Sequence, residues 1–395
     1  MSKRKIFNDP IYGLIRFPFD SIYEVIDHPY FQRLRRISQQ ALSHYVYPGA
    51  LHNRFQHAIG ATHLMCRALD ILRSKGTDIT DTEYEASCLA ILLHDIGHGP
   101  FSHALEHTLT GIHHEKISHL LIARIGMDLK KDFGLVMDIF EGTYTRKFFH
   151  QLVSGQIDVD RMDYLTRDSF FSGVAEGIIG YDRIILMMAV QNDMLVIEEK
   201  GRYSIEKFLM ARRLMYLQVY LHKTVISAEI MLIAVLRRAR HLVRSGVDIP
   251  SSDELDYFLK LDIMDDEDRF LTNFVKLDDM DILWMIKKSA GHPDPVFRKL
   301  CSDLLERRLL KVNVWTAEAE KLFWERRAAF GVKYNFTDTE LEYFFVQKKE
   351  TIRTYDKEEG EIHLLEKSGA VKAWSDVIPG MPDKDEELSF LFYPR

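Results

Sequence analysis

The sequence predicts a mainly α-helical protein with two short β-hairpins and a small α+β segment at its C-terminal end. Three observations favour this class: apolar residues recur at helical spacing over long stretches, capping-box patterns precede two of the helices, and strand-like segments are few and short. With 46% hydrophobic and 28% charged residues among 395, the composition is that of an ordinary globular chain that buries a sizeable core.

The first long helix is predicted over residues 54–74, where the apolar periodicity stops before Lys75-Gly76. Thr80-Asp81-Thr82-Glu83 then has the capping-box pattern, and the residues from Ala86 to Leu93 are almost all apolar. A helix that is apolar on every side belongs in the interior. Gly97, Gly99 and Pro100 end this segment.

Two later segments predict further helices. Ile205 to Arg244 is interpreted as one long helix, and Ser251-Ser252-Asp253-Glu254 opens another after Pro250. Thr337-Asp338-Thr339-Glu340 caps a helix near the C-terminal end.

Two hairpins are predicted from short alternating runs. The first joins Met194–Ile197 to Arg202–Ser204, and the second joins Thr351–Tyr355 to Glu361–Leu365 through a turn at Asp356–Gly360. We therefore predict a helical core over residues 1–330 and a small α+β subdomain over residues 331–395.

Charge and cysteine usage exclude several classes of protein. The formal net charge of −7 argues against duplex DNA as the main partner. Cys66, Cys88 and Cys301 show no CxxC spacing, which favours a reducing compartment. No apolar run follows the basic N-terminus, and Val225–Leu236 is too short to span a membrane and contains a glutamate. We expect a cytoplasmic protein that does not bind membranes.

The pair His94-Asp95 carries the strongest chemical signal. It follows the apolar helix, so Asp95 is expected at the negative end of the helix dipole, where a bound cation would offset the unfavourable charge. An isolated pair would more often be a surface aspartate with a capping histidine. His57 and the carboxylates around Asp160 favour the metal site instead. Two imidazoles and two carboxylates suit Mn, Fe, Zn or Ni, and Mg is expected to bind with the substrate phosphates.

The order His57, His94-Asp95, Asp160 resembles the H…HD…D signature of HD-domain phosphohydrolases. The runs at residues 7–11, 31–34, 47–50, 52–55, 94–103 and 158–168 are similar to the deoxynucleoside triphosphate triphosphohydrolase branch of that superfamily. The resemblance covers roughly residues 5–240, with the HD motif region at about 50–170, and it implies an HD-type helical bundle.

Several roles follow from the resemblance alone. It implies that His57, His94, Asp95 and Asp160 bind a metal ion, and that Asp95 also takes part in catalysis. His114 and Glu106 would form a proton relay, although the family usually has aspartate at the position of Glu106, and His103 would be the general acid. The substrate contacts implied are Gln39, Arg54, His98, Arg161, Tyr164, Asp168, Arg212 and Tyr220.

The resemblance also implies a nucleotide-effector site. Its residues would be Lys5, Asp27, Gln32 and Arg35, together with Arg307 and Lys311 from a neighbouring subunit. A GTP or deoxynucleotide effector bound there implies a homo-oligomer, either a dimer or a tetramer. The alternative is that Arg33, Arg35 and Arg36 form a solvated helix face.

The expected activity is metal-dependent hydrolysis of a deoxynucleoside triphosphate to the deoxynucleoside and triphosphate. One alternative keeps the HD site but changes the substrate to another nucleotide or phosphate ester. A second alternative is a nucleotide-sensing or single-strand nucleic-acid binding module with little catalysis. Base preference, native metal, need for an effector, subunit number and the role of residues 331–395 stay open.

Overall fold

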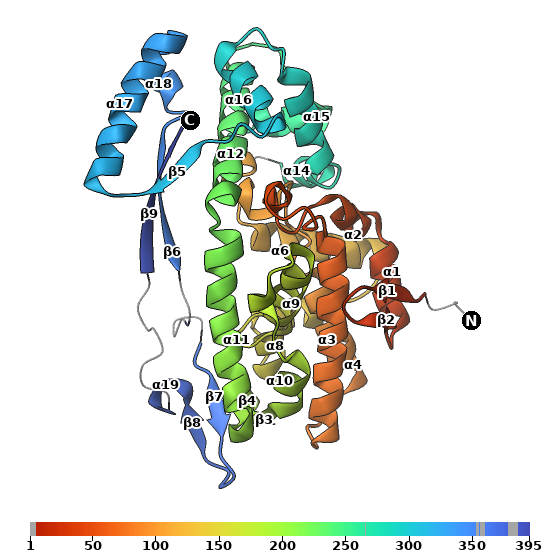
Figure 1. Ribbon diagram of the computed structural model, residues 1–395. Coiled ribbons are helices and arrows are strands. Elements are labelled where there is room, and N and C mark those ends of the chain that lie inside the picture. Colours follow the sequence, from red (N-terminus) through yellow and green to blue (C-terminus); the bar gives the residue numbers. More distant parts are fainter. Residues whose placement is uncertain (1–4, 265, 353–354, 356–359, 378–385) are drawn as a thin grey trace.

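The computed structural model describes residues 5–264, 266–352, 355, 360–377 and 386–395. It confirms a mainly α-helical chain with small sheets (Figure 1). The centre is formed by α3 (Arg54–Ser74), which packs against both α4 (Asp81–Leu93) and α9 (Val159–Ser172). Leu92 and Leu93 are fully buried, as predicted for an all-apolar helix.

Local capping explains where these central helices begin. The side chain of Asn53 accepts a hydrogen bond from the backbone amide of Gln56, and the side chain of Gln56 accepts one from the backbone amide of Asn53. From this capping box α3 runs over the predicted residues 54–74. The predicted capping box of Thr80 and Glu83 starts α4. The second predicted box, Thr337 and Glu340, starts α18 (Asp338–Leu341).

The predicted helix from Ile205 to Arg244 is wrong as a single element. The chain forms α11 (Arg202–Met215), a π-helical turn at Tyr216–Tyr220, and α12 (Lys223–Arg244), with a bend of 61° at the break. Short π-helical segments are common where helices carry functional side chains. Within the described ranges no single helix has the length and hydropathy to cross a membrane; only this bent pair, taken together, meets that criterion.

The remaining helices surround this centre (Figure 1). Their bounds are α1 (Asp20–Asp27), α2 (Pro29–Gln32), α5 (Glu106–Leu109), α6 (His114–Leu129), α7 (Gly134–Glu141), α8 (Phe148–Val153), α10 (Tyr181–Met187), α13 (Asp253–Lys260), α14 (Glu267–Phe274), α15 (Asp279–Ser289), α16 (Pro295–Leu305), α17 (Ala317–Tyr334) and α19 (Trp374–Val377). The helices from α14 to α18 lie toward one end of the molecule, whereas α19 lies at the other end beside β8 (Val371–Ala373).

Both predicted hairpins are wrong in their strand partners. Strand β4 (Met194–Glu198) pairs with the preceding β3 (Met188–Gln191) through a turn at Asn192-Asp193, whereas residues 202–204 begin α11. Both turn residues have positive φ, which asparagine and aspartate tolerate better than most residues. The predicted second turn, at 356–360, lies mostly outside the described residues.

The C-terminal strands pair with distant parts of the chain. β6 (Val346–Ile352) and β5 (Lys311–Val314) flank β9 (Glu386–Tyr393), and β7 (His363–Leu365) lies between β4 and β8 (Val371–Ala373). At the N-terminal end, β1 (Phe7–Asp9) pairs with β2 (Gly13–Ile15). The segment after residue 331 therefore shares one sheet with β5 and another with the β3–β4 hairpin.

Candidate metal and substrate site

Three helices bring the four predicted metal ligands together. His57 lies in the first turn of α3, His94 and Asp95 follow α4, and Asp160 lies in the first turn of α9. His57 Nε2 is 3.0 Å from Oδ1 of Asp160 and 3.5 Å from Oδ2 of Asp95. His94 Nε2 is 3.3 Å from the same oxygen of Asp160. His57, His94 and Asp160 thus place ligand atoms within 4.8 Å of one another, and the carboxylate of Asp95 lies beside both imidazoles.

The donor set fits a divalent transition metal ion. Among the residues that the structure describes, His57 Nε2 and His94 Nε2 are buried yet have no aligned hydrogen-bond partner. Burial lowers the pKa of His57, but the carboxylates of Asp160 and Asp163 outweigh it and raise that pKa to about 10. The site thus stabilises positive charge, and a cation satisfies both orphaned nitrogens.

An outer layer of charged groups, missed by the sequence analysis, orients His57. Its Nδ1 lies 2.8 Å from Oδ2 of Asp163, and the guanidinium of Arg167 holds both oxygens of Asp163 at 2.9 Å. Arg167 in turn binds Asp9 at 2.9 Å. Such partners fix the ring orientation of a metal-binding histidine. The only signal was spacing, since Asp163 and Arg167 lie one and two turns after Asp160 on α9.

Arg54 connects the metal ligands to the loop after α4. It forms an ion pair with Asp95, and its Nε donates to Ser102 Oγ at 2.6 Å. Burial raises the pKa of Asp95, but the charge of Arg54 helps to outweigh burial and to lower that pKa to about 2. Phe101 and Ser102 both have a φ of 55°, and Asp279 of α15 accepts the Phe101 amide at 2.7 Å. A residue far away in sequence therefore holds this strained loop.

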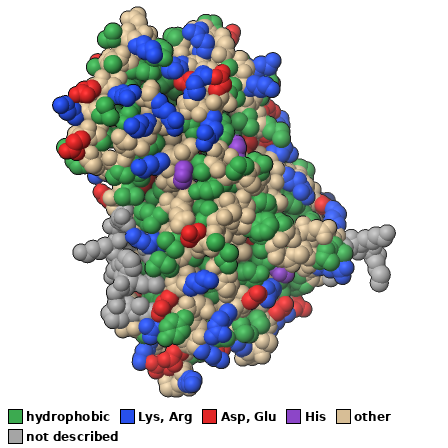
Figure 2. Space-filling model, in the orientation of Figure 1, with side chains coloured by type: hydrophobic (Ala, Val, Ile, Leu, Met, Phe, Trp, Pro, Cys, Tyr) green, Lys and Arg blue, Asp and Glu red, His purple; other side chains and the backbone are tan. Residues whose placement is uncertain are grey.

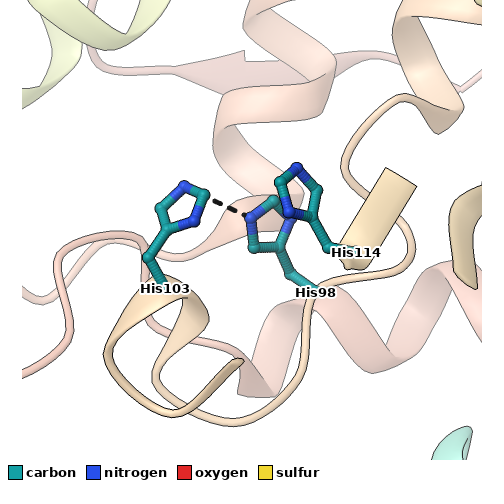
Figure 3. A group of neighbouring side chains, drawn as sticks. All are labelled: His98, His103 and His114. Carbon is teal, nitrogen blue, oxygen red and sulfur yellow. Dashed lines mark hydrogen bonds between the residues drawn. The ribbon is translucent and has the colours of Figure 1, made fainter. Parts of the chain in front are cut away.

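The predicted proton-relay residues Glu106 and His114 form one cluster with the predicted general acid His103. Figure 3 shows the two imidazoles of this cluster together with His98. Oε1 of Glu106 lies 2.7 Å from Nδ1 of His114, and Oε2 lies 3.2 Å from Nδ1 of His103. The longer glutamate thus reaches both imidazoles at once. Its own pKa lies well below the ordinary value because these hydrogen bonds outweigh burial.

His98 packs against the ring of His114 with a centroid distance of 3.9 Å, and its Nε2 is 3.4 Å from Nε2 of His103. Burial holds the pKa of His98 well below its ordinary value. Gly97 permits the approach of α6, since a Cβ atom there would lie 2.2 Å from the carbonyl oxygen of His114 and 2.4 Å from the Ser118 amide.

A pocket of about 320 Å³ opens beside the metal ligands Asp95 and Asp160. The predicted substrate residues Tyr164 and Asp168 follow Asp160 along one stripe of α9 and line it. Asp168 is held by His52 at 2.7 Å and by the hydroxyl of Tyr220 at 2.6 Å. Other predicted residues in the lining are Gln39, Arg54, His103 and Tyr220.

Several lining residues were not among the predicted substrate contacts, and Tyr216, Gln40 and Glu229 are three of them. Tyr216 and Tyr220 are the first and last residues of the π-helical turn. Both rings line the pocket. The side chain of Gln40 is buried, and neither of its amide atoms has a hydrogen-bond partner within the described ranges. Glu229 of α12 completes one wall, where burial raises its pKa to about 7.

The lining does not include two arginines among the predicted substrate contacts, Arg161 and Arg212. The guanidinium of Arg161 binds the carbonyl oxygen of Gly155 and the carboxylate of Asp158, the N-cap residue of α9. Arg212 is buried near the end of α11, and two of its guanidinium nitrogens have no hydrogen-bond partner in the part of the chain described.

The predicted effector residues fall into two groups. Lys5 and Asp27 form an ion pair, and Gln32 Oε1 accepts a hydrogen bond from Arg35 at 2.8 Å. Arg307 instead donates to the Tyr45 carbonyl at 2.9 Å, and Lys311 lies on β5.

Arg307 also lines a separate surface cavity of about 510 Å³ between α16 and α17. Lys and Arg side chains gather at that end of the molecule (Figure 2). The basic residues in the cavity lining are Lys299, Arg307, Arg308, Arg326, Lys333 and Arg395.

The chain is similar to known families and structures. The HD domain model matches residues 54–168, which carry all four candidate metal ligands, and the HD associated region model matches residues 179–263. An uncharacterized protein of Bacillus subtilis, YwfO, is 31% identical across the whole chain and 93% of its own length.

Two further relatives are named for an activity. The crystal structure of a phosphohydrolase from Bacteroides thetaiotaomicron is 43% identical and covers all of both chains with a TM-score of 0.94. A deoxynucleoside triphosphate triphosphohydrolase SAMHD1 homolog from Dictyostelium discoideum is 30% identical over 81% of this chain and 62% of its own.

Proposed function

The chain belongs to the HD-domain phosphohydrolase superfamily, and we propose that it hydrolyses deoxynucleoside triphosphates to the deoxynucleoside and inorganic triphosphate. The observation that supports this most is the shared helix stripe of Asp160, Tyr164 and Asp168, which leads from the metal ligands into the pocket. It offers a ring for the sugar and a carboxylate for the 3′-hydroxyl beside the expected α-phosphate position.

A divalent cation held by His57, His94, Asp95 and Asp160 would supply a Lewis acid for the α-phosphate. The chain's own residues handle the protons. Glu106 and His114 orient the attacking water and take its proton, and His103 protonates the departing 5′-oxygen. Arg54 offsets charge at the phosphates.

One water is consumed in the proposed reaction. Its oxygen forms a new bond to the α-phosphorus while the bond from that phosphorus to the 5′-oxygen breaks. The products are a deoxynucleoside and triphosphate, and no covalent enzyme intermediate is required. Tyr164 would exclude ribonucleotides by occupying the space that a 2′-hydroxyl needs.

Substitution of Asp95 tests the proposal. Asp95→Asn removes a charge from the metal site, and we expect deoxynucleotide hydrolysis to fall by at least about 10²–10³-fold. Products are separated by chromatography after incubation with each deoxynucleotide and with Mn or Mg. Asp138→Asn, on α7 and bonded to Thr143, is the matched control. Hydrolysis by Asp95→Asn at the wild-type rate would contradict the mechanism.

Product identity separates this proposal from the alternative substrates. Inorganic triphosphate supports it, whereas orthophosphate or pyrophosphate favours another nucleotide or phosphate ester. Tight single-strand binding without turnover over a panel of metals and nucleotides favours a binding module.

Three further expectations remain proposals: activation by GTP or a deoxynucleotide, assembly into a dimer or tetramer, and a cytoplasmic location. The same assay with and without GTP, together with the mass of the protein in solution, tests the first two.

A further inference from the structure

Three histidines outside the four metal ligands converge on one another. His98, His103 and His114 each place a ring nitrogen within 4.8 Å of the others (Figure 3). Nε2 of His98 lies 3.4 Å from Nε2 of His103. Two of the rings are fixed by packing, since the side chains of His98 and His114 are only 2% and 15% exposed.

The second nitrogen of each ring is already engaged by an oxygen atom. Nδ1 of His98 lies 3.3 Å from the carbonyl oxygen of Asp95. Glu106 engages Nδ1 of both His103 and His114, at 3.2 Å and 2.7 Å. When each Nδ1 donates its proton to its oxygen, each Nε2 is left with a bare lone pair. Two lone pairs then face each other across 3.4 Å, which is unfavourable unless a cation lies between them.

This pattern is typical of metal-binding histidines. Such residues usually donate the non-ligating N–H to a carboxylate or a backbone carbonyl. Tetrahedral zinc with Zn–N bonds of about 2.0–2.1 Å places its nitrogen ligands about 3.4 Å apart. The observed separation of the His98 and His103 nitrogens has this length.

We propose that His98, His103 and His114 form a second transition-metal site, suited to Zn²⁺, with a fourth position for water or a phosphate oxygen. Filling it inhibits catalysis, a consequence that rests on the proposed function, because the ion occupies imidazoles that handle protons in the reaction. His103, with its side chain 67% exposed, is the ligand through which the ion enters.

Metal content tests the site independently of activity. Purified protein is titrated with Zn²⁺ and, in parallel, with Co²⁺, whose visible absorption is stronger in tetrahedral than in octahedral sites. Bound metal is counted by mass spectrometry after gel filtration. We expect two ions per wild-type chain. In His103→Ala the affinity of the second site should be at least about 100-fold weaker, because removing a ligand weakens binding more than removing an outer-shell partner does.

His113→Ala is the matched control. His113 is an exposed neighbour of His114 and could form a different set of ligands with Glu106 and His114. We expect this variant to keep both ions and the tetrahedral cobalt spectrum. The proposal is overturned if wild type binds one ion, if His103→Ala binds as wild type does, or if only His113→Ala loses the second ion.

His94→Ala separates the two sites, because it should lose the first ion and keep the tetrahedral cobalt signal. Zinc inhibition of deoxynucleotide hydrolysis should follow occupancy of the second site. Two bound ions without any deoxynucleotide hydrolysis would support the site while contradicting the proposed function. A cobalt signal lost in His94→Ala but retained in His103→Ala would instead place the ion among the four HD ligands.

Discussion

At the scale of single residues, the orientation of His57 depends on groups that do not touch the candidate metal position. Asp163 and Arg167 are buried behind its ring, and Asp9 closes the chain of charges. Each buried charge has a partner of opposite sign, which offsets the cost of removing it from water. The ring is therefore held in place before any ligand binds.

Removing the charge of Asp163 should weaken metal binding without removing a ligand. In Asp163→Asn we expect the metal affinity of the HD site to fall by about 10–100-fold, the usual effect of losing an outer-shell partner. Competition with a coloured chelator measures the affinity, and circular dichroism checks the fold.

Asp182→Asn is the control for that substitution, since Asp182 is 63% exposed and pairs with Arg67 at the surface. Surface pairs contribute little, so its metal affinity should equal that of wild type. Equal affinities in all three proteins would show that the outer shell does not tune the site.

At the scale of elements, local signals predicted helices well and strand pairing poorly. The limits of α3 follow from its N-cap residue Asn53 and its C-cap residue Lys75, which directly precede and follow the helix in the sequence. The partners of β6 and β7 are β9 and β4, which are separated from them by long stretches of chain. Register between distant strands depends on tertiary packing, so alternation alone could not identify it.

The crossing of α3 and α9 requires a glycine. A Cβ atom at Gly60 would lie 2.1 Å from Oδ1 of Asp163 and 2.2 Å from a guanidinium nitrogen of Arg167. We expect Gly60→Ala to lower the free energy of unfolding. Overpacking should destabilise the protein by about 1–3 kcal/mol, which exceeds the stabilisation of about 1 kcal/mol that alanine gives as a better helix former. Urea unfolding measures this loss of stability.

The matched control for Gly60→Ala is Gly291→Ala, where a Cβ atom would meet open space. Its free energy of unfolding should stay within about 0.5 kcal/mol of wild type. If Gly60→Ala is as stable as this control, the close approach of α3 and α9 is not required.

At the scale of the whole molecule, charges of the C-terminal segment act on a residue of the substrate pocket. Lys348 and Glu350 of β6 are the charged neighbours of Glu229 on α12, which lines the pocket. Burial is the main cause of the raised pKa of Glu229, and these residues, more than a hundred positions away, modulate it in opposite directions. The sequence analysis assigned no role to this segment, because its contacts exist only in the folded chain.

Titration of Glu229 gives a pH-dependent prediction. Folding raises its pKa from the ordinary 4.5 to about 7, chiefly by burial, so the folded state binds this proton more tightly. Its contribution to stability is thus largest below pH 4.5 and is lost as the pH rises to 7. Glu229→Gln should match wild type near pH 4.

Above pH 7 the same variant should be more stable by roughly 1–2 kcal/mol, a value reduced from the full pKa shift because the side chain is only half-buried. Urea unfolding of both proteins from pH 4 to 8 measures the difference. A difference that does not change with pH would show that Glu229 titrates normally.

The sequence by itself predicted the residues that we propose carry the chemistry. His57, the His94-Asp95 pair and Asp160 were identified from residue type and order, and the helices around them from short-range capping and periodicity. Only the tertiary structure decided how these groups are held and what else they meet. The support from Asp163 and Arg167, the pocket wall at Glu229 and the convergence of three histidines depend on packing between segments distant in the chain, which no local pattern records.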